Sequence, residues 1–136
     1  MKQTLITLAV AMSFGFAGSA GAAMSKADHT AAKDRIEADY KAAKKQCDSL
    51  KANAKDVCEE EAEAKEKIAK AELDQQHKPS PAHARKVAEA KAEGAHEVAK
   101  EKCDDQAGDA KAACVKQAKA DEAQAKAEIK AKKKTM

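Results

Sequence analysis

Four cysteines, arranged as two pairs, constrain the fold of this chain more than any other feature. The pairs are Cys47 with Cys58 and Cys103 with Cys114, and each pair encloses ten residues. On one unbroken helix the two members of a pair would stand about 16 Å apart, whereas a disulfide requires Cα atoms within about 7 Å. Either the chain therefore reverses direction between the members of each pair, or each cysteine bonds elsewhere.

The N-terminus indicates the compartment in which these cysteines fold. Lys2 precedes an apolar run from Leu5 to Ala17, and small residues follow as far as Ala23. This pattern predicts a signal peptide over residues 1–23, cleaved after Ala22 or Ala23. The apolar run is shorter than the roughly 20 residues that a membrane-spanning helix needs, and no cysteine follows it to carry a lipid anchor. We expect a periplasmic protein with no membrane span, in a compartment where disulfides persist.

Composition favours helices over any fold that needs a large core. Charged residues make up 36% of the chain and alanine supplies most of the 43% that counts as hydrophobic; after the predicted leader, Tyr40 is the only aromatic residue. Alanine, glutamate and lysine are strong helix formers that lose little side-chain freedom in a helix. The predicted fold class is all-α, with long helices and little core.

An internal repeat organises the chain. A shift of 56 positions places Cys47 on Cys103 and Cys58 on Cys114, and also aligns the short segments that follow the first cysteine of each pair. Between the two copies, residues 77–83 read HKPSPAH, and their prolines Pro79 and Pro81 disfavour helix in the residues that precede them. The sequence predicts one helical hairpin over residues 24–76, a hinge over residues 77–83 and a second hairpin over residues 84–136.

Turn signals lie midway between the cysteines of each pair. Gly108 suits a left-handed position past a helix end, and Asp109 suits the N-cap of the next helix. The first copy carries a weaker version, in which Ala52 replaces the glycine and Asn53 is the expected N-cap. These signals favour two antiparallel helices in each unit.

The turns predict that each disulfide closes within its own hairpin, Cys47 with Cys58 and Cys103 with Cys114. A single fold of the whole chain about Ser80 would instead pair Cys47 with Cys114 and Cys58 with Cys103. That arrangement would place Gly108 inside a helix, at a cost of about 1 kcal/mol. Free thiols or disulfides between chains are the third alternative.

Each predicted hairpin has one apolar stripe on its incoming helix and one on its returning helix, which we expect to pack together. In the first hairpin they are Ile36, Tyr40, Ala43 and Cys47, then Val57, Ala64, Ile68 and Ala71; in the second they are Val87, Gly94 and Val98, then Val115, Ala118, Ala125 and Ile129.

Residues that could carry chemistry are few. The cysteine spacing matches neither a C-x-x-C redox motif nor the ligand pairs of a structural zinc site. The histidines are scattered along the chain, at His29, His77, His83 and His96. We therefore expect no enzyme, no cofactor and no dedicated metal site, and weak metal capture by the histidines is kept as an alternative.

A lysine cluster ends the chain. Its members are Lys130, Lys132, Lys133 and Lys134. Cations at this position suit the negative end of a helix dipole. The same cluster could contact lipopolysaccharide, acidic glycans or phosphate groups. Nucleic acid is not an expected partner, because acidic residues balance the basic ones over the chain as a whole.

Residues 34–58, DRIEADYKAAKKQCDSLKANAKDVC, and residues 98–114, VAKEKCDDQAGDAKAAC, resemble the repeat of exported proteobacterial helical proteins that are often labelled hypothetical or TolA-like cell envelope proteins. The resemblance covers nearly all of the chain after the leader. In that group the turn commonly reads Gly-Asn or Gly-Asp before Ala-Lys, which Gly108 and Asp109 match and Ala52 does not. The resemblance implies a periplasmic helical repeat protein with no established activity.

Taken together, the sequence predicts a non-enzymatic, envelope-associated structural or stress-related interaction module. Its expected partners are envelope proteins or anionic envelope polymers, and exposed alanine seams would allow pairing between copies. The alternative is a periplasmic binding protein for metal ions or anionic envelope polymers. A thiol-based redox protein is a third class.

Overall fold

A computed structural model describes residues 24–135, with side chains described through residue 133. The predicted signal peptide, residues 1–23, lies outside the described residues. The described chain forms four α-helices joined by short connections: α1 (Lys26–Cys47), α2 (Asn53–His77), α3 (Pro81–Cys103) and α4 (Gly108–Thr135). The predicted all-α fold class is confirmed.

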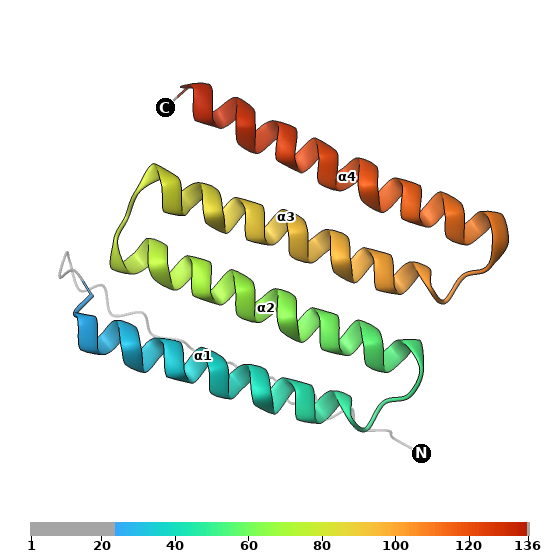
Figure 1. The fold of residues 1–136 in the computed structure, drawn as a ribbon, viewed down its shortest axis with the longest axis horizontal. Coiled ribbons are helices and arrows are strands. Elements are labelled where there is room, and N and C mark those ends of the chain that lie inside the picture. The colour runs from blue at the N-terminus through green and yellow to red at the C-terminus, as the bar shows by residue number, and fades with distance from the viewer. Residues whose placement is uncertain (1–23, 136) are drawn as a thin grey trace, which may run out of the picture.

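The four helices lie side by side in a single layer and alternate in direction (Figure 1). Among the described residues, each helix packs only against its neighbours in the sequence, and α2 packs more extensively against α3 than α1 does against α2 or α4 against α3. Consequently α1 and α4 are edge helices with one neighbour each, and the layer has two broad faces. The α1–α2 and α3–α4 turns lie at one end of the layer; α1 begins, α4 ends and α2 turns into α3 at the other.

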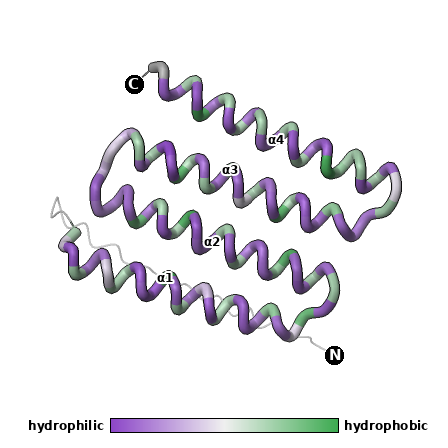
Figure 2. Tube along the Cα trace, viewed as in Figure 1, coloured by the Kyte–Doolittle hydropathy of each residue, from purple (hydrophilic) through white to green (hydrophobic). Residues whose placement is uncertain are grey.

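The interior of this layer is thin. Among the described residues, the buried hydrophobic side chains are Cys47, Ala62, Ala64, Leu73, Cys103 and Ala118. Hydrophobic residues appear as short bands between longer hydrophilic stretches on every helix (Figure 2). Because five of these six side chains are cysteine or alanine, burial of apolar surface contributes less here than in an ordinary globular domain.

Both disulfides close within their own hairpins, as predicted. Cys47 bonds to Cys58 and Cys103 to Cys114, each with Cα atoms 5.6 Å apart, so the long-range pairing is wrong. The first cysteine of each pair is the last residue of the incoming helix, α1 or α3. The second lies in the early turns of the outgoing helix. Each bond therefore joins the two helices of a hairpin next to the turn that connects them.

The turns differ in detail from the prediction. They span residues 48–52 and 104–107, so each begins several residues before the turn signals at Ala52 and Gly108. Ala52 and Gly108, which align in the repeat, both have left-handed backbones, with φ of 51° and 56°. Glycine adopts this conformation without strain, whereas alanine does so at a cost.

The predicted N-caps Asn53 and Asp109 are corrected by the structure. The N-cap of α2 is Ala52, and its first helical residue, Asn53, uses its amide Nδ2 to donate to the backbone oxygen of Glu101 on α3, at 3.0 Å. This contact between helices replaces the local cap. Asp109 lies inside α4, which begins at Gly108, in the first turn where a carboxylate suits the positive helix end.

The connection between the hairpins is shorter than the predicted hinge. Only residues 78–80 lie between helices, so Pro79 is in the connection while Pro81 is the first residue of α3. Ser80 caps α3, its hydroxyl oxygen accepting from the backbone N–H of His83 at 3.0 Å. Proline at the first helical position needs no hydrogen bond from its nitrogen, which explains why α3 begins here rather than at residue 84.

Close packing between α2 and α3 centres on Gly94. A Cβ atom at this position would lie 2.8 Å from the Cβ of Ala64 and 3.8 Å from Cδ1 of Ile68, both on α2. The expectation that Gly94 belongs to a seam with α4 is therefore wrong. Ion pairs reinforce the contact, because the Nζ atom of Lys91 lies 2.6 Å from Glu72 and that of Lys102 lies 2.9 Å from Glu61.

Within residues 24–135, no helix has both the length and the apolar character needed to cross a membrane.

Candidate functional site

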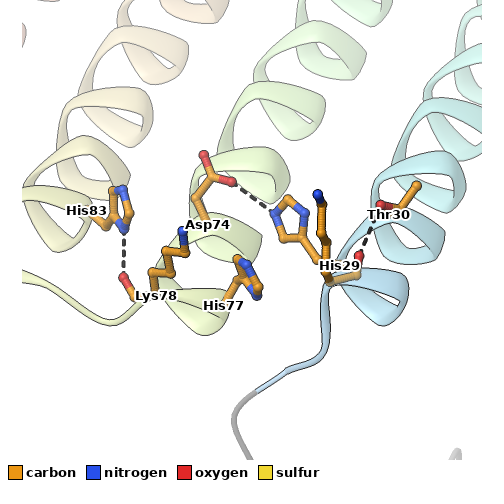
Figure 3. Close-up of a pocket in the computed structure, with 7 residues that line it drawn as sticks. His29, Thr30, Asp74, His77, Lys78 and His83 are labelled. Carbon is orange, nitrogen blue, oxygen red and sulfur yellow. Dashed lines mark hydrogen bonds and ion pairs between the residues drawn. The ribbon is translucent and has the colours of Figure 1, made fainter.

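A histidine cluster lies where α1 begins and α2 ends (Figure 3). Within a surface hollow of about 610 Å³, the lining residues are Lys26, His29, Thr30, Asp74, His77, Lys78 and His83. They come from the first turns of α1, the last turn of α2, the connection and the start of α3. Six of the seven residues carry basic or hydroxyl groups, and Asp74 is the one acid among them.

His29 joins α1 to α2 through two contacts. Its Nε2 atom lies 3.1 Å from Oδ1 of Asp74, and its ring centroid lies 4.5 Å from that of His77, with the planes tilted by 36°. These histidines are scattered in the sequence, 48 positions apart, and the fold brings them together. The Cys47–Cys58 disulfide sets an antiparallel register that places His29 opposite the end of α2. This register would have predicted the contact between the two histidines.

The other histidines in this hollow bond to the backbone. Nδ1 of His77 lies 3.1 Å from the carbonyl oxygen of Met24, and Nδ1 of His83 lies 2.7 Å from that of Lys78. Each ring therefore donates an N–H from Nδ1 to a carbonyl oxygen. His77 thus joins the end of α2 to the residue two positions before α1, and His83 joins the start of α3 to the connection that precedes it.

His96 holds α4 against α3 at the middle of the second hairpin. Its side chain is only 10% exposed, and its Nδ1 atom lies 3.2 Å from the backbone oxygen of Ala118 and 3.8 Å from Oε2 of Glu122. The aligned position in the first hairpin is Tyr40, whose hydroxyl donates to Glu63 at 3.4 Å. The aligned positions Tyr40 and His96 thus each place a ring-bearing polar side chain across the seam of their hairpin.

Among residues 24–133, no three or more histidine, cysteine, aspartate or glutamate side chains are arranged to hold a metal ion. All four cysteines are in disulfides.

The predicted lysine cluster lies on the last turns of α4. Lys132 and Lys133 line a second hollow, of about 970 Å³, together with residues from the first half of α3. Lys130 is exposed, and α4 continues through Lys134. The cluster therefore borders a concave surface at the same end of the layer as the histidines.

Carboxylates gather near the disulfide end of the layer, on the first turns of α2 and the last turns of α3. Burial raises the pKa of Glu60, and repulsion from Glu63, Glu97 and Glu101 raises it further. Its neighbour Glu61 behaves in the opposite way, because a hydrogen bond from Lys102 lowers its pKa. Adjacent residues on α2 therefore make contributions of opposite sign to stability.

These two residues give a matched prediction. At pH 7, Glu60→Gln is expected to raise the free energy of unfolding and Glu61→Gln to lower it, each by about 0.5 kcal/mol because both sites are largely solvated. The raised pKa of Glu60 means that its charged form opposes folding, whereas the lowered pKa of Glu61 means that its charged form favours folding. Urea denaturation measures both differences. As the pH falls, the Glu60 difference should shrink first, because its raised pKa means that it is protonated at a higher pH than an ordinary glutamate. The Glu61 difference should persist to lower pH, because its pKa is lowered. Equal shifts of the same sign at pH 7 would contradict this assignment.

The arrangement as a whole offers contact surfaces: a histidine-lined corner, a basic hollow and an acidic region at the opposite end. Comparison of the chain with protein-family models, curated proteins and solved structures found no match in any of the three.

Proposed function

We propose that this protein is a non-enzymatic, periplasmic helical repeat protein that acts by contact, as an envelope-associated structural or stress-related interaction module. On this proposal, residues 1–23 direct export, the disulfides form in the oxidising compartment, and the helical layer binds envelope proteins or anionic envelope polymers. Pairing between copies through the edge helices is part of the same proposal.

One observation carries the proposal: over residues 24–135, the helices form a single layer in which each helix packs only against the helices next to it in the sequence. Such a layer presents far more surface per residue than a closed bundle, and stacked helical hairpins use such surfaces to bind partners. The two disulfides hold the edge helices α1 and α4 at the turns. This covalent attachment supports a role for the layer outside the cytoplasm.

The second candidate function, binding of anionic envelope polymers, is supported by Lys132 and Lys133 beside a hollow of about 970 Å³. The metal alternative is supported only by the contact between His29 and His77.

Photo-crosslinking in bacterial cells tests the proposal. A photoreactive residue replaces Ala38 on α1 or Ala120 on α4, both of which are exposed, and the same residue at buried Ala64 is the matched control. We expect the exposed positions to form reproducible adducts with envelope proteins or polymers in the periplasmic fraction, and Ala64 to form none. The intact mass of the recovered protein should place its N-terminus at Ala23 or Met24. Recovery from the cytoplasm with an uncleaved leader, or no adducts at either exposed position, would contradict the proposal.

A further inference from the structure

A hollow with an apolar floor and a basic rim opens between the start of α3 and the end of α4. Its volume is about 970 Å³. The floor includes Ala88, Ala92, Ala125 and Ile129, and the rim includes Arg85 and Lys133. Glu128 is the one acid among the lining residues, which also include Lys91 and Lys132.

The aligned positions of the first hairpin explain the apolar part of this hollow. Ala92 aligns with Ile36, and Ile129 aligns with Leu73. Leu73 is 6% exposed, whereas Ile129 is only half-buried. Replacing the branched side chain of isoleucine by the methyl group of alanine removes apolar volume from this seam, and α4 has no further helix on its outer side to cover what remains.

The charged part of the hollow has an equally direct origin. Arg85 aligns with His29, and Lys133 aligns with His77. In the first hairpin the two histidine rings are in contact, with centroids 4.5 Å apart. In the second hairpin the same positions carry two permanent cations, and both line the hollow.

Two of the cations that line the hollow form ion pairs with acids that do not line it. Arg85 pairs with Glu89 of its own helix, at 3.5 Å, and remains 37% exposed. Lys91 pairs with Glu72 on α2, away from the seam. An anion between Arg85 and Lys133 would neutralise two like charges at once, which is a direct argument from charge complementarity for an anionic occupant.

The floor adds a requirement for an apolar chain. From Arg85 to Ala92 the lining of α3 runs for seven residues, which at 1.5 Å per residue is about 10 Å. The floor therefore suits a single acyl chain that starts at the rim, with alanine side chains that allow close approach along this length.

We propose that this hollow binds a single-chain fatty-acid anion, with the carboxylate between Arg85 and Lys133 and the chain along Ala88, Ala92 and Ile129. The inference goes beyond the contact role proposed above and does not depend on it, because it concerns a small ligand in one seam rather than a partner on the faces of the layer.

Fluorescence titration of the full oxidised protein with a dansylated undecanoate tests this proposal, with unlabelled dodecanoate as competitor. We expect saturable binding, displacement by dodecanoate and no displacement by an uncharged dodecyl detergent below its micelle concentration. Ala92→Ile restores the side chain of the first hairpin and should weaken binding by about tenfold or more, because it fills the floor. Ala31→Ile, on the exposed surface of α1, is the matched control and should leave binding unchanged.

A second variant tests the rim separately. Arg85→His with Lys133→His restores the histidine pair and, at about pH 8 where both rings are neutral, should also weaken binding by about tenfold or more. Circular dichroism melting confirms that each variant is folded. The proposal is overturned if the probe does not bind, if neither variant weakens binding, or if the uncharged detergent displaces the probe as well as dodecanoate does. None of these results bears on crosslinking in cells, so failure here is distinguishable from failure of the proposed contact role.

Discussion

Replacing Cys103 and Cys114 by serine is expected to remove about 3 kcal/mol from the free energy that holds α4 in place, because the disulfide closes a 12-residue loop in the unfolded chain. Little else can compensate. Only α3 packs against α4, and Ala118 is the one buried hydrophobic side chain that α4 contributes within the described residues. The helix should therefore open locally before the rest of the layer unfolds.

Hydrogen exchange measured by mass spectrometry locates this effect. Amides of α4 in the Cys103→Ser, Cys114→Ser variant should exchange about 100-fold faster than in the oxidised protein, since each 1.4 kcal/mol changes an equilibrium about tenfold. Amides of α2 should change little. The matched variant, Cys47→Ser with Cys58→Ser, should release α1 in the same way. Retained protection in α4 would show that packing, and not the disulfide, holds the edge helix.

Substitution of Gly94 is expected to separate α2 from α3. For Gly94→Ala, the new Cβ atom would lie 2.8 Å from the Cβ of Ala64, and such overpacking costs about 1 to 3 kcal/mol. Alanine recovers about 1 kcal/mol of helix propensity relative to glycine, so the net loss of stability should be about 1 kcal/mol. For Gly94→Leu, with no compensating space, the loss should reach about 3 kcal/mol.

Urea denaturation of the oxidised protein measures these losses, and a size swap identifies their cause. In the double variant Gly94→Ala with Ala64→Gly, the methyl group moves from α2 to α3, and most of the stability lost in Gly94→Ala should return. Ala95→Leu, at the adjacent exposed position, should change stability by less than about 0.5 kcal/mol. If Gly94→Ala instead stabilised the protein by about 1 kcal/mol, as on an isolated helix, the close contact between α2 and α3 would be refuted.

The Gly94 contact is a feature of the fold that could not be predicted from the sequence. The apolar stripe through Gly94 was visible as a helical face, but periodicity shows that a face is buried without showing which helix buries it. Two hairpins joined by prolines were expected to have separate seams. Instead, the connection is only three residues long and its last residue, Ser80, caps α3. As a result, α2 and α3 make the most extensive contact of the layer.

The candidate sites also include one that could be predicted from the sequence and two that could not. The lysine cluster was recognisable because its members are consecutive or nearly so in the sequence. The His29–His77 contact and the basic hollow were not, because their members are far apart in the chain and meet only once the hairpin register is known. With the disulfide pairing in hand, alignment of the two hairpins could have located both.

The sequence by itself determined that this chain is helical, and it favoured a reversal between the cysteines of each pair and local disulfides over the long-range pairing. These properties depend on side-chain propensity, on glycine and proline geometry, and on the short reach of a disulfide, all of which act over a few residues. Only the tertiary structure decided that α2 packs closely on α3, that Asn53 reaches Glu101 instead of capping its own helix, and that the second hairpin stays open at its end. Those outcomes depend on which side chains meet across helices, such as Gly94 against Ala64 and Asn53 against Glu101, and local preferences do not encode these contacts.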